Sequence, residues 1–239
     1  MSLTLGAVMR DVREALAGPQ YAVIVWGEEA LRKLGAPIPP GFDHEVMLVV
    51  ESRHMADAGK RLQEAQFEHV PWSFGIDAER RTPMLPAANN QIMIDFRSFD
   101  ESSEHYVFRR VHTSRKETIK VALIPATYAN ISTERDPIDD FDKMFGFYWP
   151  KPGRLMISFI KTLVNGPIAG CWKRLLIMWA AYWLYRGKTL PETVMDYCDN
   201  EMARRYFVAC IRPMQFAPCL PPVPGMENQF VGVYVPPYF

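Results

Sequence analysis

Two carboxylates separated by one residue, Asp43 and Glu45, are the clearest sign of chemistry in this sequence. The apolar run that begins at Val46 predicts a strand, and side chains alternate along a strand, so the two carboxylates point the same way. A third carboxylate, Asp95, stands near the end of QIMIDF, which also alternates like a strand. Carboxylates on neighbouring strands can share one or two Mg²⁺ ions.

A glycine turn precedes this carboxylate pair. Residues 22–26 form a short apolar run rich in valine and isoleucine, which predicts a buried strand. The run ends in Trp26-Gly27-Glu28, and residues 28–34 are expected to form a helix. Strand, turn, helix, loop and strand in this order suit metal-assisted chemistry on a phosphate.

The order of these motifs resembles the nucleotidyltransferase superfamily, which includes polymerase-beta-like and tRNA-processing enzymes. The family pattern is a glycine turn, a short spacer, Asp-x-Asp or Asp-x-Glu, and a third carboxylate on a later strand. The matching stretches are Trp26-Gly27-Glu28, Asp43-His44-Glu45-Val46 and Ile94-Asp95-Phe96. More narrowly, WGEEAL, LGAPI and FYWPKPGR resemble a divergent group of fungal proteins of this fold.

The resemblance implies a set of site residues. Asp43, Glu45 and Asp95 would hold Mg²⁺ and, together with Glu28, form the catalytic group. Trp26, Gly27 and His44, which belong to the matching motifs, would contact the substrate. The basic residues expected to contact it come from the charge distribution and not from the resemblance, and these are Arg97, Arg109, Lys120, Lys151, Arg154 and Lys161. The alternative interpretation is that Asp43 caps a turn while Glu45 and Asp95 are charges at strand edges.

Glu28 departs from the family pattern. The family has Gly or Ser at this second turn position, because backbone amides there cradle a triphosphate. Glu28 and the following Glu29 complement the dipole of a helix N-terminus but would repel a triphosphate. Glu28 therefore either binds a polar or cationic substrate group or caps the helix. His44 also differs from the usual apolar residue between the two carboxylates.

Charge is distributed unevenly along a chain whose net charge is zero. Residues 1–142 carry 16 Lys and Arg against 22 Asp and Glu, whereas residues 143–239 carry 11 against 5. Lys151, Arg154 and Lys161 have helical spacing and predict a basic face that could contact a phosphodiester backbone. The alternative for this face is a solvated helix surface, and the alternative for the uneven charge as a whole is that opposite charges simply hold two lobes together.

The elements expected around these residues indicate an α+β fold. We expect a nucleotidyltransferase-like mixed sheet flanked by helices and followed by a helical lobe. The predicted divisions are an α/β lobe over residues 1–132, a linker over 133–142, a helical lobe over 143–212 and a proline-rich wrapping tail over 213–239. Helices are expected over 4–16, 28–34, 54–66, 152–164, 172–185 and 190–205, and strands over 22–26, 45–50, 67–70, 91–96, 106–113 and 118–123.

Composition limits the other classes of protein. No run of about 18 uncharged apolar residues is present, which argues against a membrane span. The four cysteines form no C-x-x-C pair, so neither zinc nor a disulfide framework is expected, and a reducing cytoplasm is the default. No obligate protein partner is inferred.

Three functions remain open. The first is a divergent nucleotidyltransferase-like transferase that acts on a phosphate-bearing substrate, such as tRNA or a nucleotide, with Mg²⁺. The second is a repurposed transferase that joins aminoacyl groups from tRNA into a cyclic dipeptide, with Glu28 or Glu45 binding the amine of the amino acid. The third is a non-catalytic binding module.

Overall fold

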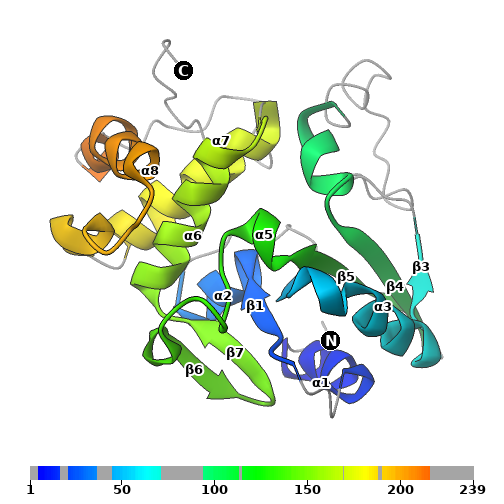
Figure 1. Ribbon diagram of the computed structural model, residues 1–239. Coiled ribbons are helices and arrows are strands. Elements are labelled where there is room, and N and C mark those ends of the chain that lie inside the picture. The colour runs from blue at the N-terminus through cyan, green and yellow to red at the C-terminus, as the bar shows by residue number, and fades with distance from the viewer. Residues whose placement is uncertain are drawn as a thin grey trace.

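The computed structural model describes residues 5–16, 21–36, 45–70, 94–112, 115–168, 170–187 and 190–215. Asp43, His44 and the tail after residue 215 lie outside these residues. Within the described part, a seven-stranded mixed sheet carries helices on both faces, and further helices follow it along the chain (Figure 1).

The sheet has the strand order β3-β4-β5-β2-β1-β7-β6. β2 pairs parallel with β5, and β1 pairs parallel with β7, while the other neighbours are antiparallel. The strands are β1 (Ile24–Trp26), β2 (Glu45–Val50), β3 (Glu68–His69), β4 (Glu104–His112), β5 (Arg115–Pro125), β6 (Phe141–Met144) and β7 (Phe147–Pro150).

Helices connect and cover these strands. The α-helices are α1 (Leu5–Ala15), α2 (Gly27–Lys33), α3 (Met55–Glu64), residues 94–100, α5 (Ala126–Ala129), α6 (Pro152–Asn165), α7 (Gly170–Met178) and α8 (Glu201–Tyr206). α7 continues as a π-helix over Trp179–Arg186, and α8 continues as one over Phe207–Ile211. Short 3₁₀ turns occur at Ser52–His54, Ile138–Asp140, Glu192–Met195 and Arg212–Gln215. None of the helices in the described part is both long enough and apolar enough to cross a membrane.

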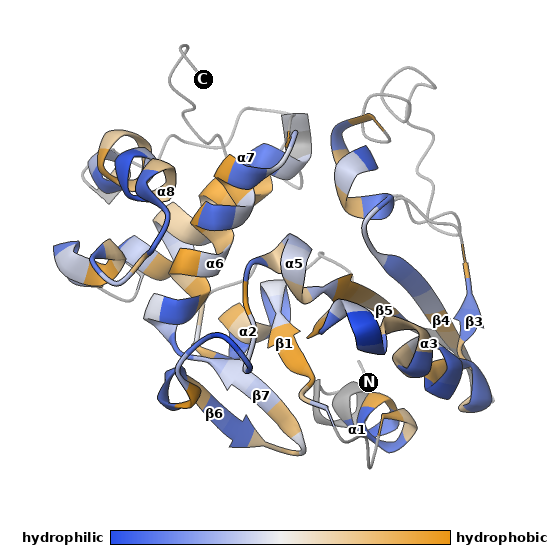
Figure 2. Ribbon diagram, in the orientation of Figure 1, coloured by the Kyte–Doolittle hydropathy of each residue, from blue (hydrophilic) through white to orange (hydrophobic). Residues whose placement is uncertain are grey.

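The two faces of the sheet are buried by different helices. Tyr106 of β4 points to the face covered by α3, because its hydroxyl lies against Gly59. Trp26 of β1 points to the opposite face, where its indole nitrogen donates to Ser158 Oγ of α6 at 2.8 Å. Hydrophobic residues run along β1 at the centre of the sheet (Figure 2). β1 is therefore buried on both faces, as the apolar run 22–26 predicted.

These elements confirm the predicted α+β class, a mixed sheet flanked by helices and followed by a mainly helical region. The predicted order of strand, glycine turn, helix and strand is present as β1, α2 and β2.

One predicted strand is wrong. Residues 94–100 are helical, whereas the alternation in residues 91–96 predicted a strand that would carry Asp95. Phe96 and Phe99 are three residues apart, which is a helical spacing, and both rings pack on Trp172. A six-residue alternating run did not distinguish this helical face from a strand.

The β6–β7 hairpin also corrects the expected start of the helical region. Residues 143–150 were assigned to the helical lobe, but they form most of this hairpin, and Tyr148 of β7 pairs with Ile24 of β1. The helical region begins at Pro152. The predicted helix 190–205 is likewise shorter, because α8 begins only at Glu201, where Asn200 caps it by accepting from the amide of Ala203.

Candidate functional site

The glycine turn between β1 and α2 is tightly packed. Gly27 has a φ of +63°, a left-handed conformation that favours glycine. A Cβ at this position would lie 2.5 Å from Met47 Sδ and 3.3 Å from Trp179 Cη2. On the side where this Cβ would point, the turn is filled by protein side chains and leaves no room for a phosphate.

Two buried carboxylates follow this glycine. Glu28 and Glu29 are 5% and 0% exposed, and both form ion pairs with Arg32 one turn further along α2. The distance between Glu28 Oε2 and Arg32 Nη2 is 3.2 Å. Arg32 thus supplies the cationic partner that a substrate group was expected to supply. This geometry favours the alternative in which Glu28 stabilises the start of the helix.

The position beside Glu45 is occupied by a lysine. β2 and β5 are parallel neighbours, and their register places the backbone of Glu45 level with that of Lys120. In the family pattern, a third carboxylate from a neighbouring strand completes the metal site. This chain instead has the half-buried Lys120 in that place. The structure therefore joins two predicted site residues, Glu45 and Lys120, in an arrangement that the sequence pattern did not indicate.

Asp95 lies on a helix and not on the strand beside β2. The residue is 4% exposed, and a Cβ on Gly170 would come within 1.9 to 2.1 Å of its carboxylate atoms. The carboxylate therefore lies against the first residue of α7, where the amide end of a helix favours an anion. This contact gives Asp95 a structural role at the start of α7.

The residues present fit a three-carboxylate metal site poorly. No group of three His, Cys, Asp or Glu side chains that could hold a metal ion exists in the part of the chain that the structure describes. Asp43 and the side chain of Glu45 lie outside that part. A Mg²⁺ site here would rest on those two carboxylates, because the neighbouring position of β5 carries Lys120 and not a third carboxylate.

Trp26 was expected to contact substrate, but it is a core residue. It is 0% exposed and packs against the rings of Phe159, Trp172 and Trp179. Its hydrogen-bond partner Ser158 in turn donates to the carbonyl oxygen of Ala129 at 2.5 Å. Trp26 joins the central strand to the C-terminal helices, so its role is structural.

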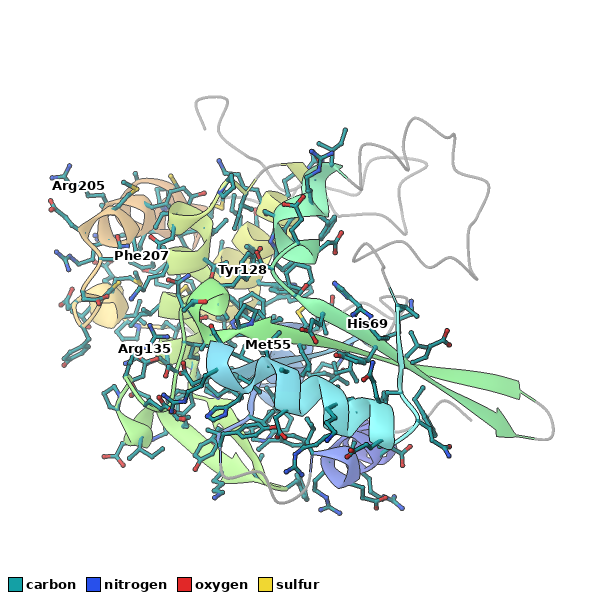
Figure 3. The ribbon with its side chains drawn as sticks, turned by 45° about the vertical axis from the view of Figure 1, so that its right-hand side comes forward. Met55, His69, Tyr128, Arg135, Arg205 and Phe207 are labelled. Atoms are coloured by element: carbon teal, nitrogen blue, oxygen red, sulfur yellow. The ribbon has the colours of Figure 1, made fainter. Side chains whose placement is uncertain are left out.

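Tyr128 was not singled out by any sequence motif. Figure 3 shows it where the helix 94–100 meets the C-terminal helices, and its hydroxyl accepts a hydrogen bond from Trp172 Nε1 at 2.8 Å. Burial raises the pKa of Tyr128 to about 12, which keeps the phenol protonated at neutral pH. Tyr128 can therefore serve as a hydrogen-bond donor but not as a base.

The predicted basic face of α6 is largely neutralised. Arg154 contacts Asp136 at 2.8 Å and Asp140 at 2.5 Å, and Lys161 contacts Asp199 at 2.8 Å. These pairs favour the interpretation that opposite charges hold parts of the chain together.

Other predicted basic residues differ in accessibility. Lys151 and Arg97 are exposed, whereas the side chain of Arg109 lies outside the described residues. Of the basic residues assigned to the substrate, Lys151 and Arg97 are therefore the accessible ones in the described part.

We expect Arg154→Gln to lower the free energy of unfolding by about 2 kcal/mol, because the Arg154 side chain is 11% exposed and its loss leaves two carboxylates without their guanidinium. Urea unfolding measures this change. Arg205→Gln is the matched control, since its pair with Glu201 is exposed on both sides and such pairs contribute at most about 1 kcal/mol. Equal effects of the two substitutions would contradict the structural role of Arg154.

Known proteins resemble this chain only weakly. No protein-family model matches the chain, and no curated protein sequence matches it. Two solved structures are similar, each with a TM-score of 0.40 and 13% identity over 85% of this chain. One is JHP933 from Helicobacter pylori, covered over 77% of its length. The other is a Helicobacter pylori protein, covered over 80%, whose description proposes it to be a nucleotidyltransferase.

Proposed function

We propose that this chain is a transferase on a nucleotidyltransferase-like scaffold that acts on a phosphate-bearing substrate, with tRNA as the substrate class. The register of Glu45 and Lys120 in adjacent parallel strands carries the proposal. A lysine ammonium is a compact cation that binds phosphate as a point charge. A carboxylate at the same level of the sheet can accept a proton from an attacking group.

The packing of the glycine turn argues for a reaction other than nucleotidyl transfer. Met47 and Trp179 fill one side of the Gly27 turn, and the start of α2 is occupied by Glu28 and Glu29 with their shared partner Arg32. A reaction that needs no triphosphate avoids this conflict. The aminoacyl ester of tRNA is already activated, and it meets that requirement.

The transfer follows from ordinary acyl chemistry. An amine attacks the ester carbonyl, a C–N bond forms, and the C–O bond to the tRNA ribose breaks. Glu45 takes the proton from the attacking amine and passes it to the ribose oxygen, which leaves as a hydroxyl. Two such transfers between two aminoacyl groups would give a cyclic dipeptide and two free tRNAs, which is the more specific form of this proposal.

An accessible cation at the same end of the sheet supports a large anionic substrate. β7 runs parallel to β1, and β1 runs antiparallel to β2, so the end of β7 and the start of β2 lie at one end of the sheet. Lys151 directly follows β7 and is exposed. It can contact a substrate phosphate that lies beyond the Glu45 and Lys120 positions.

The test compares Lys120→Gln with Lys120→Arg. We expect Lys120→Gln to weaken tRNA binding about tenfold and to lower the salt dependence of binding, because one phosphate contact is lost. Lys120→Arg, which keeps the charge, should retain most of the affinity. Lys60→Gln is the control, because it removes the same charge from the exposed surface of α3. Fluorescence anisotropy with labelled tRNA at several salt concentrations measures the affinities.

A second measurement separates the reaction classes. We expect the chain to release amino acid or dipeptide from aminoacyl-tRNA, and Glu45→Gln to abolish that release while tRNA binding persists. Pyrophosphate release from ATP with Mg²⁺ would overturn the proposal in favour of nucleotidyl transfer. If the native chain bound tRNA but released no product from aminoacyl-tRNA, it would instead be a non-catalytic binding module.

A further inference from the structure

The turn between β6 and β7 contains an unusual residue. Phe145 and Gly146 connect the two strands, and their φ angles are +55° and +84°. Two-residue hairpin turns with positive φ at both positions strongly prefer Asn-Gly or Asp-Gly. A phenylalanine at the first position adopts a left-handed conformation that is unfavourable for a residue with a bulky side chain.

Burial does not offset this conformational cost. The side chain of Phe145 is 66% exposed, so it adds little to the hydrophobic core. Two other non-glycine residues in the described part have positive φ, and they are Gln66 and Asn130. Phe145 combines a left-handed backbone with an exposed aromatic ring, which indicates that the ring serves a contact outside the fold.

Cationic side chains stand beside this ring. Arg13 of α1 lies against the turn, since its Cγ would be 3.9 Å from a Cβ on Gly146. Lys143 precedes the turn by two residues, and its Nζ lies 5.2 Å from the centroid of the Tyr148 ring. Both cations belong to exposed residues. In Figure 1 the turned end of the hairpin lies beside α1.

Two carboxylates are close in sequence to these cations, but they do not neutralise both. Asp142 is held by Lys33 at 2.7 Å, and Lys33 also lies 5.5 Å from the Trp149 ring centroid. Glu14 is exposed on α1 next to Arg13. With Asp142 paired to Lys33, the surface around Phe145 keeps a positive balance from Arg13 and Lys143.

We propose that Phe145, Arg13 and Lys143, here called the hairpin patch, bind a single-stranded stretch of RNA. A base stacks on the exposed ring of Phe145, while Arg13 and Lys143 contact the flanking phosphates. Aromatic rings bordered by cations bind single strands in this way, because every base has a face that can stack. A membrane surface fits less well, since it requires a broad apolar face and the turn presents one aromatic ring.

The hairpin patch is distant from the proposed reaction site. Phe145 precedes β7 at one end of the sheet, whereas Glu45 begins β2 at the opposite end. Six strand residues at about 3.3 Å each separate the two ends by about 20 Å. A small molecule cannot reach both, but a folded RNA can. The choice of RNA rests on the proposed function, whereas the binding itself does not depend on the proposed chemistry.

The decisive variant is Phe145→Asn, because asparagine is the preferred residue for this turn. We expect the melting temperature to stay the same or rise, while affinity for a labelled twelve-nucleotide oligouridylate falls about tenfold through the loss of one stacking contact. Phe145→Tyr should keep the affinity. Anisotropy measures binding, and calorimetry measures stability. A fall in affinity at unchanged stability is a result that a purely structural role of Phe145 would not produce.

The cations and the alternative ligands complete the test. Arg13→Gln and Lys143→Gln should each reduce the slope of log affinity against log salt by about 0.7. Unchanged affinity in Phe145→Asn would overturn the proposal. The proposal would also be overturned if the native chain bound an RNA duplex as tightly as oligouridylate. It would be overturned as well if Phe145→Asn lowered the affinity for anionic phosphatidylserine vesicles more than the affinity for oligouridylate. If Glu45→Gln lost turnover but kept oligouridylate binding, the hairpin patch would remain supported as a separate binding site. If Phe145→Asn kept both turnover and oligouridylate binding, the reaction would remain supported and the hairpin patch would be overturned.

Discussion

Gly27→Ala is expected to lower the free energy of unfolding by about 3 kcal/mol, the combined cost of a left-handed conformation and of overpacking. The φ of +63° disfavours any residue with a Cβ. The new methyl group would also lie 2.5 Å from Met47 Sδ and 3.3 Å from Trp179 Cη2. Met47 belongs to β2 and Trp179 to the C-terminal helices, so the methyl group would separate three packed elements.

Gly153→Ala is the matched control for this prediction. Gly153 lies in α6, and its added Cβ would meet Val194 Cγ2 at 3.5 Å, an ordinary contact distance. Alanine in a helix is more favourable than glycine by about 1 kcal/mol, so this substitution should leave stability unchanged or raise it. Urea unfolding of both variants gives the comparison. If Gly27→Ala proved as harmless as Gly153→Ala, the turn would be open and a phosphate could enter it.

The sequence predicted the order of elements around this turn because the local signals agree there. Residues 22–26 are apolar and rich in valine and isoleucine, Gly27 permits the turn, and residues 46–50 form a second apolar run. Hydrophobic patterning and a positive-φ glycine act over a few residues, so sequence reveals them. The observed β1, α2 and β2 follow from these signals.

Strand neighbours could not be predicted in the same way. Lys120 lies level with Glu45 only because β5 pairs parallel with β2 across a long stretch of intervening chain. No local pattern specifies that register. The sequence therefore suggested Asp95 as the third carboxylate, whereas the sheet places Lys120 beside Glu45 and a helix carries Asp95.

The uneven distribution of charge could be read from the sequence, but the partners of the charged residues could not. The basic residues of α6 face carboxylates that come from elsewhere in the chain, such as Asp136 and Asp199 for Arg154 and Lys161. Spacing identifies a common helical face, but it does not reveal what that face contacts. Phe145 belongs to no sequence motif, and its proposed role in binding depends on a positive φ angle that only the structure supplies.

Gly170→Ala carries the second large expected effect and tests the role of Asp95. Its Cβ would lie within 1.9 to 2.1 Å of the Asp95 carboxylate atoms, and the φ of Gly170 is +53°. The carboxylate must leave the start of α7, so we expect a loss of about 3 kcal/mol in the free energy of unfolding. Asp95→Ala alone should cost about 1 to 2 kcal/mol, as the loss of a helix-capping carboxylate does.

The double variant distinguishes this contact from a metal site. With Asp95→Ala present, Gly170→Ala no longer displaces a carboxylate, so the destabilisation of the double variant should fall short of the sum of the two single destabilisations by at least about 1 kcal/mol. Costs that add to within about 0.5 kcal/mol would contradict the contact. Asp95→Asn provides the complementary measurement, because a residue whose carboxylate serves α7 should not change stabilisation by added Mg²⁺. If Asp95→Asn instead removed a Mg²⁺-dependent rise in melting temperature, Asp95 would be a metal ligand despite lying on a helix.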